Sequence, residues 1–142
     1  MADAEARITG GLTRDVELRF TQGGLAMAVF TIAFSHRKKK DDAWEEESGF
    51  IDVTAFGTMA ENAAASGTKG SRVTVVGRIQ QQSWEDRESG QKRSKLCILA
   101  DEIAFNVKWA TVQVNKVERD KTNGGTQKSK KADPVYGEEE PF

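Results

Sequence analysis

Residues 71–105 read SRVTVVGRIQQQSWEDRESGQKRSKLCILADEIAF, which divides into two strands joined by a charged turn. Successive side chains of a strand point to opposite faces, so alternation separates a core face from an outer face. The core face of the first strand is small and apolar: Val73, Val75, Gly77 and Ile79. Its outer face is mostly polar but ends in a large ring: Thr74, Val76, Arg78, Gln80, Gln82 and Trp84. The stretch predicts a long hairpin that carries its functional residues on the outer face.

The second half of this hairpin begins with cations. The chain turns over Glu85 to Gly90 and returns through Lys92, Arg93 and Lys95 before it enters an apolar run. This order predicts a mobile charged tip with cations along one edge. A strand bulge that shifts the alternation would instead bury Trp84 in the core, so this stretch alone leaves both interpretations open.

Residues 50–56 show the same arrangement on another strand. Ile51, Val53 and Ala55 form an apolar face, whereas Phe50 and Phe56 share the opposite face with Asp52 and Thr54. Aromatic rings outside the core are platforms for the bases of single-stranded nucleic acid, at roughly 1–3 kcal/mol per base, while Lys and Arg contact the phosphates. Two independent strands therefore favour a single-stranded nucleic-acid surface.

Length and composition fit one domain followed by a tail. The 142 residues suffice for one core, and the hydrophobic share of 37% indicates that part of the chain is unfolded. The net charge of -1 argues against a basic DNA-coating protein, so binding would depend on local charge placement. A single cysteine, Cys97, indicates a reducing compartment. Without an apolar signal segment or membrane-spanning run, we expect a cytoplasmic, nucleoid-associated protein.

The first half of the chain predicts two strands and a charged loop. Residues 7–20 form a strand interrupted at Gly10-Gly11, and residues 25–34 form an apolar strand that is buried on both faces or packed against another subunit. Cations then run to Lys40, and acids with Trp44 among them follow. We interpret the acidic half as a solvated loop, and we expect phosphate contacts from Arg37, Lys38 and Lys39.

The remaining elements predict the fold class. Thr58 and Glu61 have the spacing of a capping box, and a short helix would follow to about Ser66, ended by Gly67. Strand, strand, strand, helix, strand, strand is the order of an all-β, five-stranded Greek-key barrel of the oligonucleotide/oligosaccharide-binding (OB) type. Residues 111–117 alternate as an extra C-terminal strand, which we expect to pair across a subunit boundary, with Trp109 as an interface or core anchor.

The composition changes at about Arg119. It predicts a binding and oligomerisation domain at residues 1–118 and a disordered tail at 119–142. The tail ends in acids followed by an aromatic residue: Glu138, Glu139, Glu140, Pro141 and Phe142. This tip would fit a basic, hydrophobic pocket on a partner protein, although an accidental acidic terminus is equally compatible with the tail alone.

The chain resembles the bacterial-type single-stranded-DNA-binding proteins over essentially its whole length. The matching stretches follow one another in order: Glu17-Leu18-Arg19-Phe20-Thr21, Phe30-Thr31-Ile32-Ala33, Phe56-Gly57, Ala60-Glu61-Asn62, Val76-Gly77-Arg78-Ile79, Ser83-Trp84, Gly90-Gln91-Lys92-Arg93, Asp101-Glu102-Ile103, Ala110-Thr111-Val112-Gln113-Val114-Asn115-Lys116 and the acidic Pro-Phe end. The resemblance implies an OB-fold homotetramer that binds single-stranded DNA without sequence preference.

The resemblance also implies roles for individual residues. It places base stacking on Phe50, Phe56 and Trp84, recruitment of replication, recombination and repair proteins on the tip, and subunit clamping on residues 111–117. With the cations, the candidate DNA-binding residues are Phe50, Phe56, Trp84, Arg37, Lys38, Lys39, Arg78, Lys92, Arg93 and Lys95.

Several departures from the family pattern indicate a paralogue or a phage or plasmid version. Many relatives have tryptophan at the position of Phe50. The segment from His36 to Lys40 replaces a further aromatic that relatives often have at the end of this strand, with Trp44 as a candidate substitute.

The sequence leaves two other classes of function to consider. An OB-fold replication accessory or protein-interaction module would bind DNA only weakly. An enzyme has little support, because one His, one Cys and no phosphate-binding Gly-Lys loop leave no catalytic group or metal site. We therefore expect no enzymatic activity, no cofactor and no metal.

Overall fold

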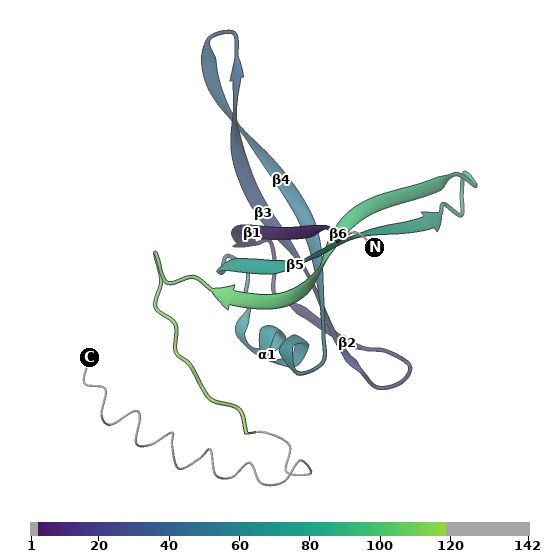
Figure 1. Cartoon of the computed structure of the whole chain (residues 1–142), viewed down its shortest axis with the longest axis vertical. Helices are drawn as coiled ribbons and strands as arrows, with labels where there is room; N and C mark the ends of the chain where they lie inside the picture. Colours follow the sequence, from purple (N-terminus) through teal and green to yellow (C-terminus); the bar gives the residue numbers. More distant parts are fainter. Residues whose placement is uncertain (1–2, 119–142) are drawn as a thin grey trace. The chain divides into compact units, whose positions relative to one another are not determined.

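The computed structural model describes residues 3–118, which contain six strands and one helix (Figure 1). In chain order these are β1 (Glu5–Leu12), β2 (Glu17–Phe20), β3 (Ala26–Lys40), β4 (Ala43–Phe56), α1 (Thr58–Ser66), β5 (Arg72–Glu85) and β6 (Lys92–Phe105). All of them lie in one compact unit, Met1–Val112, and a second unit begins at Gln113. The predicted tail at 119–142 and its tip lie outside the described residues.

Five strands close into a barrel. The sheet order is β1-β5-β6-β4-β3, and β1 also pairs with β3 through Gly11↔Ala33 and Leu12↔Ile32. The pairing of β4 with β6 is parallel and the others are antiparallel. This confirms the predicted five-stranded Greek-key OB barrel. Gly10 permits the closure, because a Cβ atom there would lie 2.2 Å from the backbone oxygen of Ala33.

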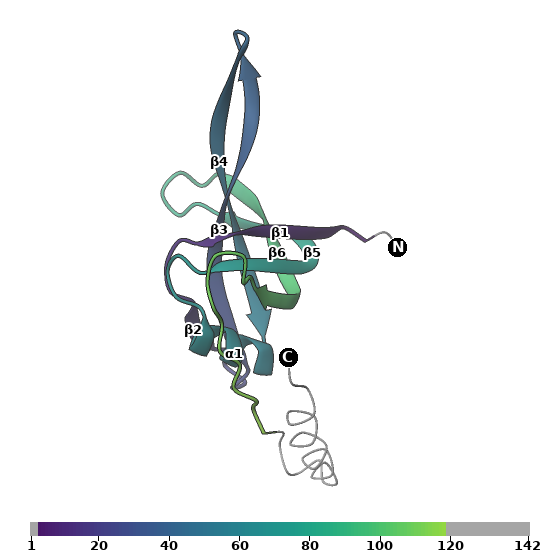
Figure 2. The same cartoon turned by 90° about the vertical axis from the view of Figure 1, so that its left-hand side faces the viewer.

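The barrel core consists of small and branched apolar side chains. Fully buried members come from four strands: Ala28, Ile32, Val53, Ala55, Val73, Val75 and Ile98. The helix packs against β3 and β4 and adds the buried Ala60 (Figure 2). The predicted core face of β5 is confirmed. Burial of β3 on both faces was wrong, because its residues alternate between buried and half-buried along the barrel wall.

The predicted first strand is two strands. β1 ends at Leu12, and the short β2 pairs only with β3, outside the ring, from Glu17↔Val29 to Phe20↔Ala26. The extra strand outside the barrel is therefore β2. Residues 106–118 form no strand in this single chain, so the predicted C-terminal strand is wrong for the chain by itself, because it has no neighbouring strand to bond with. Pairing across a subunit boundary stays a prediction.

The helix has the predicted bounds but a different cap. Gly57, with φ of 75°, is the N-cap, and no side chain caps the helix, so the capping box was wrong. The Gly57 carbonyl accepts hydrogen bonds from the backbone N–H groups of Ala60 (2.9 Å) and Glu61 (3.2 Å). At the other end, the N–H of Gly67 donates to the carbonyl of Ala63 (2.8 Å). Glycine adopts a positive φ without strain, so the sharp turn from β4 into the helix places Gly57 at the N-cap in place of Thr58.

Within residues 3–118 no helix is long and apolar enough to cross a membrane. In the same range no group of three or more His, Cys, Asp or Glu side chains could hold a metal ion. The one cysteine, Cys97, is buried in β6.

Candidate nucleic-acid interface

The strand register places the three predicted stacking residues on one outer face of the barrel wall. Side chains of paired residues on neighbouring strands point to the same side of a sheet. One row of pairs runs across four strands, from β3 through β4 and β6 to β5: Thr31↔Asp52, Asp52↔Cys97 and Cys97↔Gln80. Phe50 and Phe56 lie an even number of residues from Asp52, and Trp84 an even number from Gln80, so all three rings share this face.

These three rings lie outside the core. The exposed fractions of Phe50, Phe56 and Trp84 are 65%, 39% and 46%. The alternative in which a bulge buries Trp84 was wrong: the register shift of the β5–β6 pair lies between Val76 and Gly77, and beyond it the pairing is regular to Glu85↔Lys92. We call this surface the stacking face, defined by the side of the sheet that carries Phe50, Phe56 and Trp84.

The cations of the β5–β6 hairpin divide between its two sides. Arg93 pairs with Trp84, and Lys95 pairs with Gln82, so both lie on the stacking face. Arg78 lies there as well, because it is an even number of residues from Trp84. Lys92 is opposite Glu85 and lies on the other side. The structure therefore brings three of these four predicted cations to the rings.

A carboxylate lies in the middle of the stacking face. Asp52 forms an ion pair with Lys95, with 2.5 Å between Oδ2 and Nζ, and its Oδ1 accepts a hydrogen bond from Oγ1 of Thr31 at 2.7 Å. Lys95, then Thr31, and the positive charge of Arg14 hold the pKa of Asp52 below its ordinary value, against the opposing effect of partial burial. Lys95 thus has its own counter-charge before any ligand arrives.

Two further cations of this region were missed by the sequence analysis. Arg14 acts on Asp52, because the N–H of Thr13 donates to the carbonyl of Thr31 (3.1 Å) and holds the end of β1 beside β3. Arg19 on β2 pairs with Met27, which pairs with Phe56, so Arg19 shares the stacking face. Barrel closure and the separate β2 create these placements, and no local pattern signals them.

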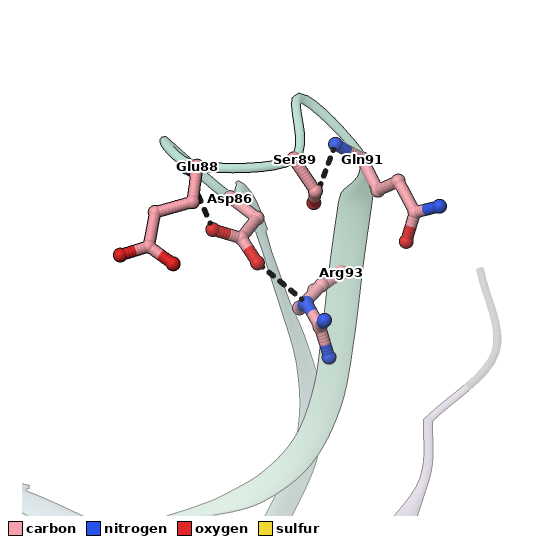
Figure 3. A network of polar contacts seen from close by, with 5 residues as sticks. All are labelled: Asp86, Glu88, Ser89, Gln91 and Arg93. Atoms are coloured by element: carbon pink, nitrogen blue, oxygen red, sulfur yellow. Dashed lines mark hydrogen bonds and ion pairs between the residues drawn. The ribbon is translucent and has the colours of Figure 1, made fainter.

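The tip of the β5–β6 hairpin is a hydrogen-bonded turn that holds Arg93 (Figure 3). Asp86 accepts hydrogen bonds from the N–H of Glu88 (3.0 Å) and from Nε of Arg93 (3.2 Å). The N–H of Gln91 donates to Oγ of Ser89 at 3.3 Å. Asp86 therefore holds the guanidinium of Arg93, the residue that pairs with Trp84 in the strand register. Mobility of the tip stays a prediction.

The basic run on β3 faces an acidic partner strand. The acidic half after Lys40 was predicted as a solvated loop, and this was wrong: β3 and β4 pair along their whole length, joined at Asp41 and Asp42, whose φ values of 51° and 66° are typical of a two-residue type I′ turn. His36 and Lys38 lie 3.1 Å and 3.9 Å from carboxylate oxygens of Glu47. The acidic half is thus the counter-charge of the basic half.

The predicted cations of this run lie on different sides of the hairpin. Arg37 and Lys39 lie on the side of the stacking face, whereas Lys38 lies on the opposite side, toward Glu47. Among residues 3–118, neither Arg37 nor Lys39 forms an ion pair. These two are therefore the cations of the hairpin that are available to a phosphate on the stacking face.

Trp109 lies outside the core of this chain. It is 71% exposed, with the guanidinium of Arg72 4.7 Å and the ammonium of Lys108 4.9 Å from the ring centroid. Its role as a core anchor was wrong for the single chain, and its role at an interface stays a prediction.

The family model described as "Single-strand binding protein family" matches residues 4–106. The chain belongs to the single-strand binding protein family. The match ends just after β6, so it covers the whole barrel and every predicted ring and cation. It also confirms the resemblance inferred from the sequence.

Members of the family described as "Single-stranded DNA-binding protein" are similar to this chain. The one from Mycolicibacterium smegmatis is 42% identical over 120 residues, which cover 82% of this chain and 72% of the relative. The one from Mycobacterium tuberculosis strain H37Rv is also 42% identical, over 82% of this chain and 73% of the relative. The one from Borreliella burgdorferi is 34% identical over 100% of both chains.

Proposed function

We propose that this protein binds and protects single-stranded DNA without sequence preference. The observation that carries the proposal is the stacking face, where the exposed rings of Phe50, Phe56 and Trp84 share one side of the sheet with Arg78, Arg93 and Lys95. Membership of the single-strand binding protein family supports it.

The proposed mechanism is base stacking combined with phosphate contacts. Every base has a π-face, so stacking on Phe50, Phe56 and Trp84 tolerates any sequence. In a duplex the faces of the bases are covered by their neighbours, so the rings would select single strands. The cations would follow the sugar-phosphate backbone, which makes affinity fall with salt. No step of this mechanism requires catalysis, and we propose a non-enzymatic protein.

The wider role is also a proposal. We place this protein in replication, recombination and repair, as a cytoplasmic homotetramer whose tip, Glu138–Phe142, recruits partner proteins. The resemblance to bacterial-type single-stranded-DNA-binding proteins supports this assignment. Deletion of Pro141 and Phe142 would abolish capture of the partners and spare DNA binding. If the deletion weakens DNA binding, the tip belongs to the DNA site and the recruitment proposal is wrong.

One observation favours the alternative of a barrel module that binds DNA only weakly. Each of the three cations beside the rings already faces a carboxylate: Lys95 faces Asp52, Arg93 faces Asp86, and Arg78 lies 3.6 Å from Asp101. Such pairs reduce the attraction for phosphate. Affinity for oligo-dT therefore decides between the two functions.

The test is a titration with oligo-dT and with a matched duplex at low and high salt, in which tryptophan fluorescence reports binding. We expect quenching by the single strand and none by the duplex. Trp84→Ala should weaken binding by about 5- to 150-fold, which corresponds to roughly 1–3 kcal/mol for one stacked base. Its thermal unfolding should match the wild type, because Trp84 lies beyond the core. Unfolding of Trp84→Ala, or unchanged affinity, would contradict the stacking role.

A further inference from the structure

Two glutamines of β5 lie between a cation and the ring on the stacking face. An even number of residues separates Gln80 and Gln82 from Trp84, so strand alternation directs them to the side of that ring. Both residues are exposed. They belong to the part of the β5–β6 hairpin that projects from the barrel in Figure 1, since the pairing of β5 with β1 ends at Arg78. The residue between them, Gln81, lies on the opposite side of the hairpin.

The side-chain amides of these two glutamines are unpaired. Among residues 3–118, neither side chain forms a hydrogen bond with another residue. Lys95 lies opposite Gln82 in the register, but its ammonium is held by Asp52. Cys97 lies opposite Gln80 and is buried. Each amide is therefore free to rotate and to exchange the positions of its carbonyl and NH₂ groups.

An amide complements the pairing edge of every base, the edge that bonds to the opposite base in a duplex. On adenine and cytosine this edge has an amino donor beside a ring-nitrogen acceptor. On thymine and guanine it has a ring N–H donor beside a carbonyl acceptor. A glutamine amide has one acceptor and one donor group side by side, so it matches either arrangement after a flip. Lys and Arg side chains have donors only and cannot match either one.

We propose that Gln80 and Gln82 hydrogen-bond to the pairing edges of the bases that lie along β5 beside Trp84, whatever the identity of those bases. This inference rests on the proposed function and adds a type of contact that stacking and phosphate pairing do not supply. Residues on one face of a strand follow one another at about 7 Å, so Gln82 lies next to a base stacked on Trp84 and Gln80 lies one position farther along.

This contact selects single strands by a second route. In a duplex each pairing edge is already bonded to the opposite base, so the amides have no group to bind there. In a single strand the edge is open, and proteins that bind single-stranded nucleic acid use it. Because the amide is neutral, it releases no counterion and leaves the salt dependence unchanged. One such hydrogen bond corresponds to about 2- to 10-fold in affinity.

The first experiment compares oligo-dT with an oligonucleotide of the same length built from N3-methylthymidine. The methyl group removes the N–H donor and blocks the pairing edge, while the face of the base and the phosphates remain. Anisotropy of the labelled oligonucleotides measures affinity for the wild type and for Gln82→Ala. We expect Gln82→Ala to weaken binding of oligo-dT by about 2- to 10-fold and to leave binding of the methylated oligonucleotide unchanged.

The other outcomes of this comparison are also decisive. An equal loss for both oligonucleotides would mean that the amide of Gln82 contacts the sugar-phosphate backbone. An unchanged affinity of Gln82→Ala for oligo-dT would mean that the amide contacts no part of the DNA. Either result would overturn the inference and leave the proposed function intact. Absence of oligo-dT binding by the wild type would overturn both.

Gln81 provides a matched control on the same strand. It is exposed like its two neighbours but pairs with Leu96 on the other side of the hairpin. Gln81→Ala should bind oligo-dT as the wild type does, whereas Gln80→Ala should weaken binding. All three alanine variants should unfold at the wild-type temperature, because the three side chains are exposed. Equal losses for Gln81→Ala and Gln82→Ala would overturn the inference.

A set of homopolymers tests whether the contact tolerates every base. Gln82→Ala should weaken binding of oligo-dT, oligo-dC and oligo-dA by similar factors, because each of these bases presents a donor beside an acceptor. A loss confined to one base would show that Gln82 recognises that base alone, and the proposal of a sequence-independent contact would be wrong.

Discussion

The ion pair between Asp52 and Lys95 offers a sharp test of how the stacking face meets phosphate. Asp52 lies in the centre of this face and holds the Lys95 ammonium at 2.5 Å. Asn has nearly the same size as Asp and can still accept the hydrogen bond from Thr31. Asp52→Asn therefore keeps the packing, removes the carboxylate and releases Lys95. We expect this variant to bind single-stranded DNA more tightly than the wild type.

The magnitude follows from counterion release. Each single-strand phosphate that a cation neutralises adds about 0.7 to the slope of log K against log salt. Relative to about 1 M salt, where such a contact contributes nothing, one added contact from Lys95 corresponds to about 8-fold tighter binding at about 50 mM salt and about 3-fold tighter binding at about 200 mM. The cost to folding is small. The Lys95 and Asp52 side chains are 44% and 35% exposed, and pairs in such positions contribute about 0–1 kcal/mol.

The assay is anisotropy of labelled oligo-dT over a salt series, with two controls. Glu61→Gln removes a carboxylate from an exposed position on α1 and should not change the slope. Asp52→Asn combined with Lys95→Gln should lose the gain, because the released ammonium is gone. If Asp52→Asn and the wild type have the same affinity and the same slope, Lys95 does not contact phosphate and the counter-charge reasoning is refuted.

Three further predictions concern stability and stacking. The folded-state pKa of Asp52 lies below its ordinary value of 3.8, so the contribution of this carboxylate to stability is present above pH 3.8 and is lost as the pH falls through the lowered folded-state pKa. Urea unfolding of the wild type and of Asp52→Asn, measured between about pH 5 and about pH 2, should show this loss in the wild type alone. Gly77→Ala should destabilise the barrel by about 1–3 kcal/mol, because its Cβ atom would lie 2.2 Å from the backbone oxygen of Leu99; Gly23→Ala, with open space around it, is the control, and equal melting temperatures would contradict the packing. Phe50→Trp should tighten oligo-dT binding, since a larger exposed ring stacks over more of a base; an unchanged dissociation constant would remove Phe50 from the stacking site.

Alternation within single strands correctly predicted the barrel and the exposure of the three rings. The apolar faces of β4 and β5 are local patterns, and each one places its aromatic residues on the opposite side without reference to the rest of the chain. The same local patterns could not show where one strand ends and another begins. The segment between Leu12 and Glu17 carries no strong turn signal, so β1 and β2 were predicted as one strand.

Charge was predicted less well than the rings, because charge depends on partners that are distant in sequence. Arg37, Lys38 and Lys39 were all expected to contact phosphate, with no counter-charge in the protein itself. The anions are the glutamates on the paired strand, and the register divides the cations between two sides. In the same way, Asp52 meets Lys95 only through the parallel pairing of β4 with β6, a contact that no short window of sequence contains.

These paired charges determine what kind of binding to expect. A cation that must leave a carboxylate of its own protein to contact a phosphate contributes less binding free energy than a cation that was surrounded by water and free ions. On the stacking face this applies to Lys95, Arg93 and Arg78. The rings have no such competitor, so stacking should supply more of the affinity than phosphate contacts do. The protein, with a net charge of -1, should therefore show a shallow salt dependence for its number of cations, and Asp52→Asn should make that dependence steeper.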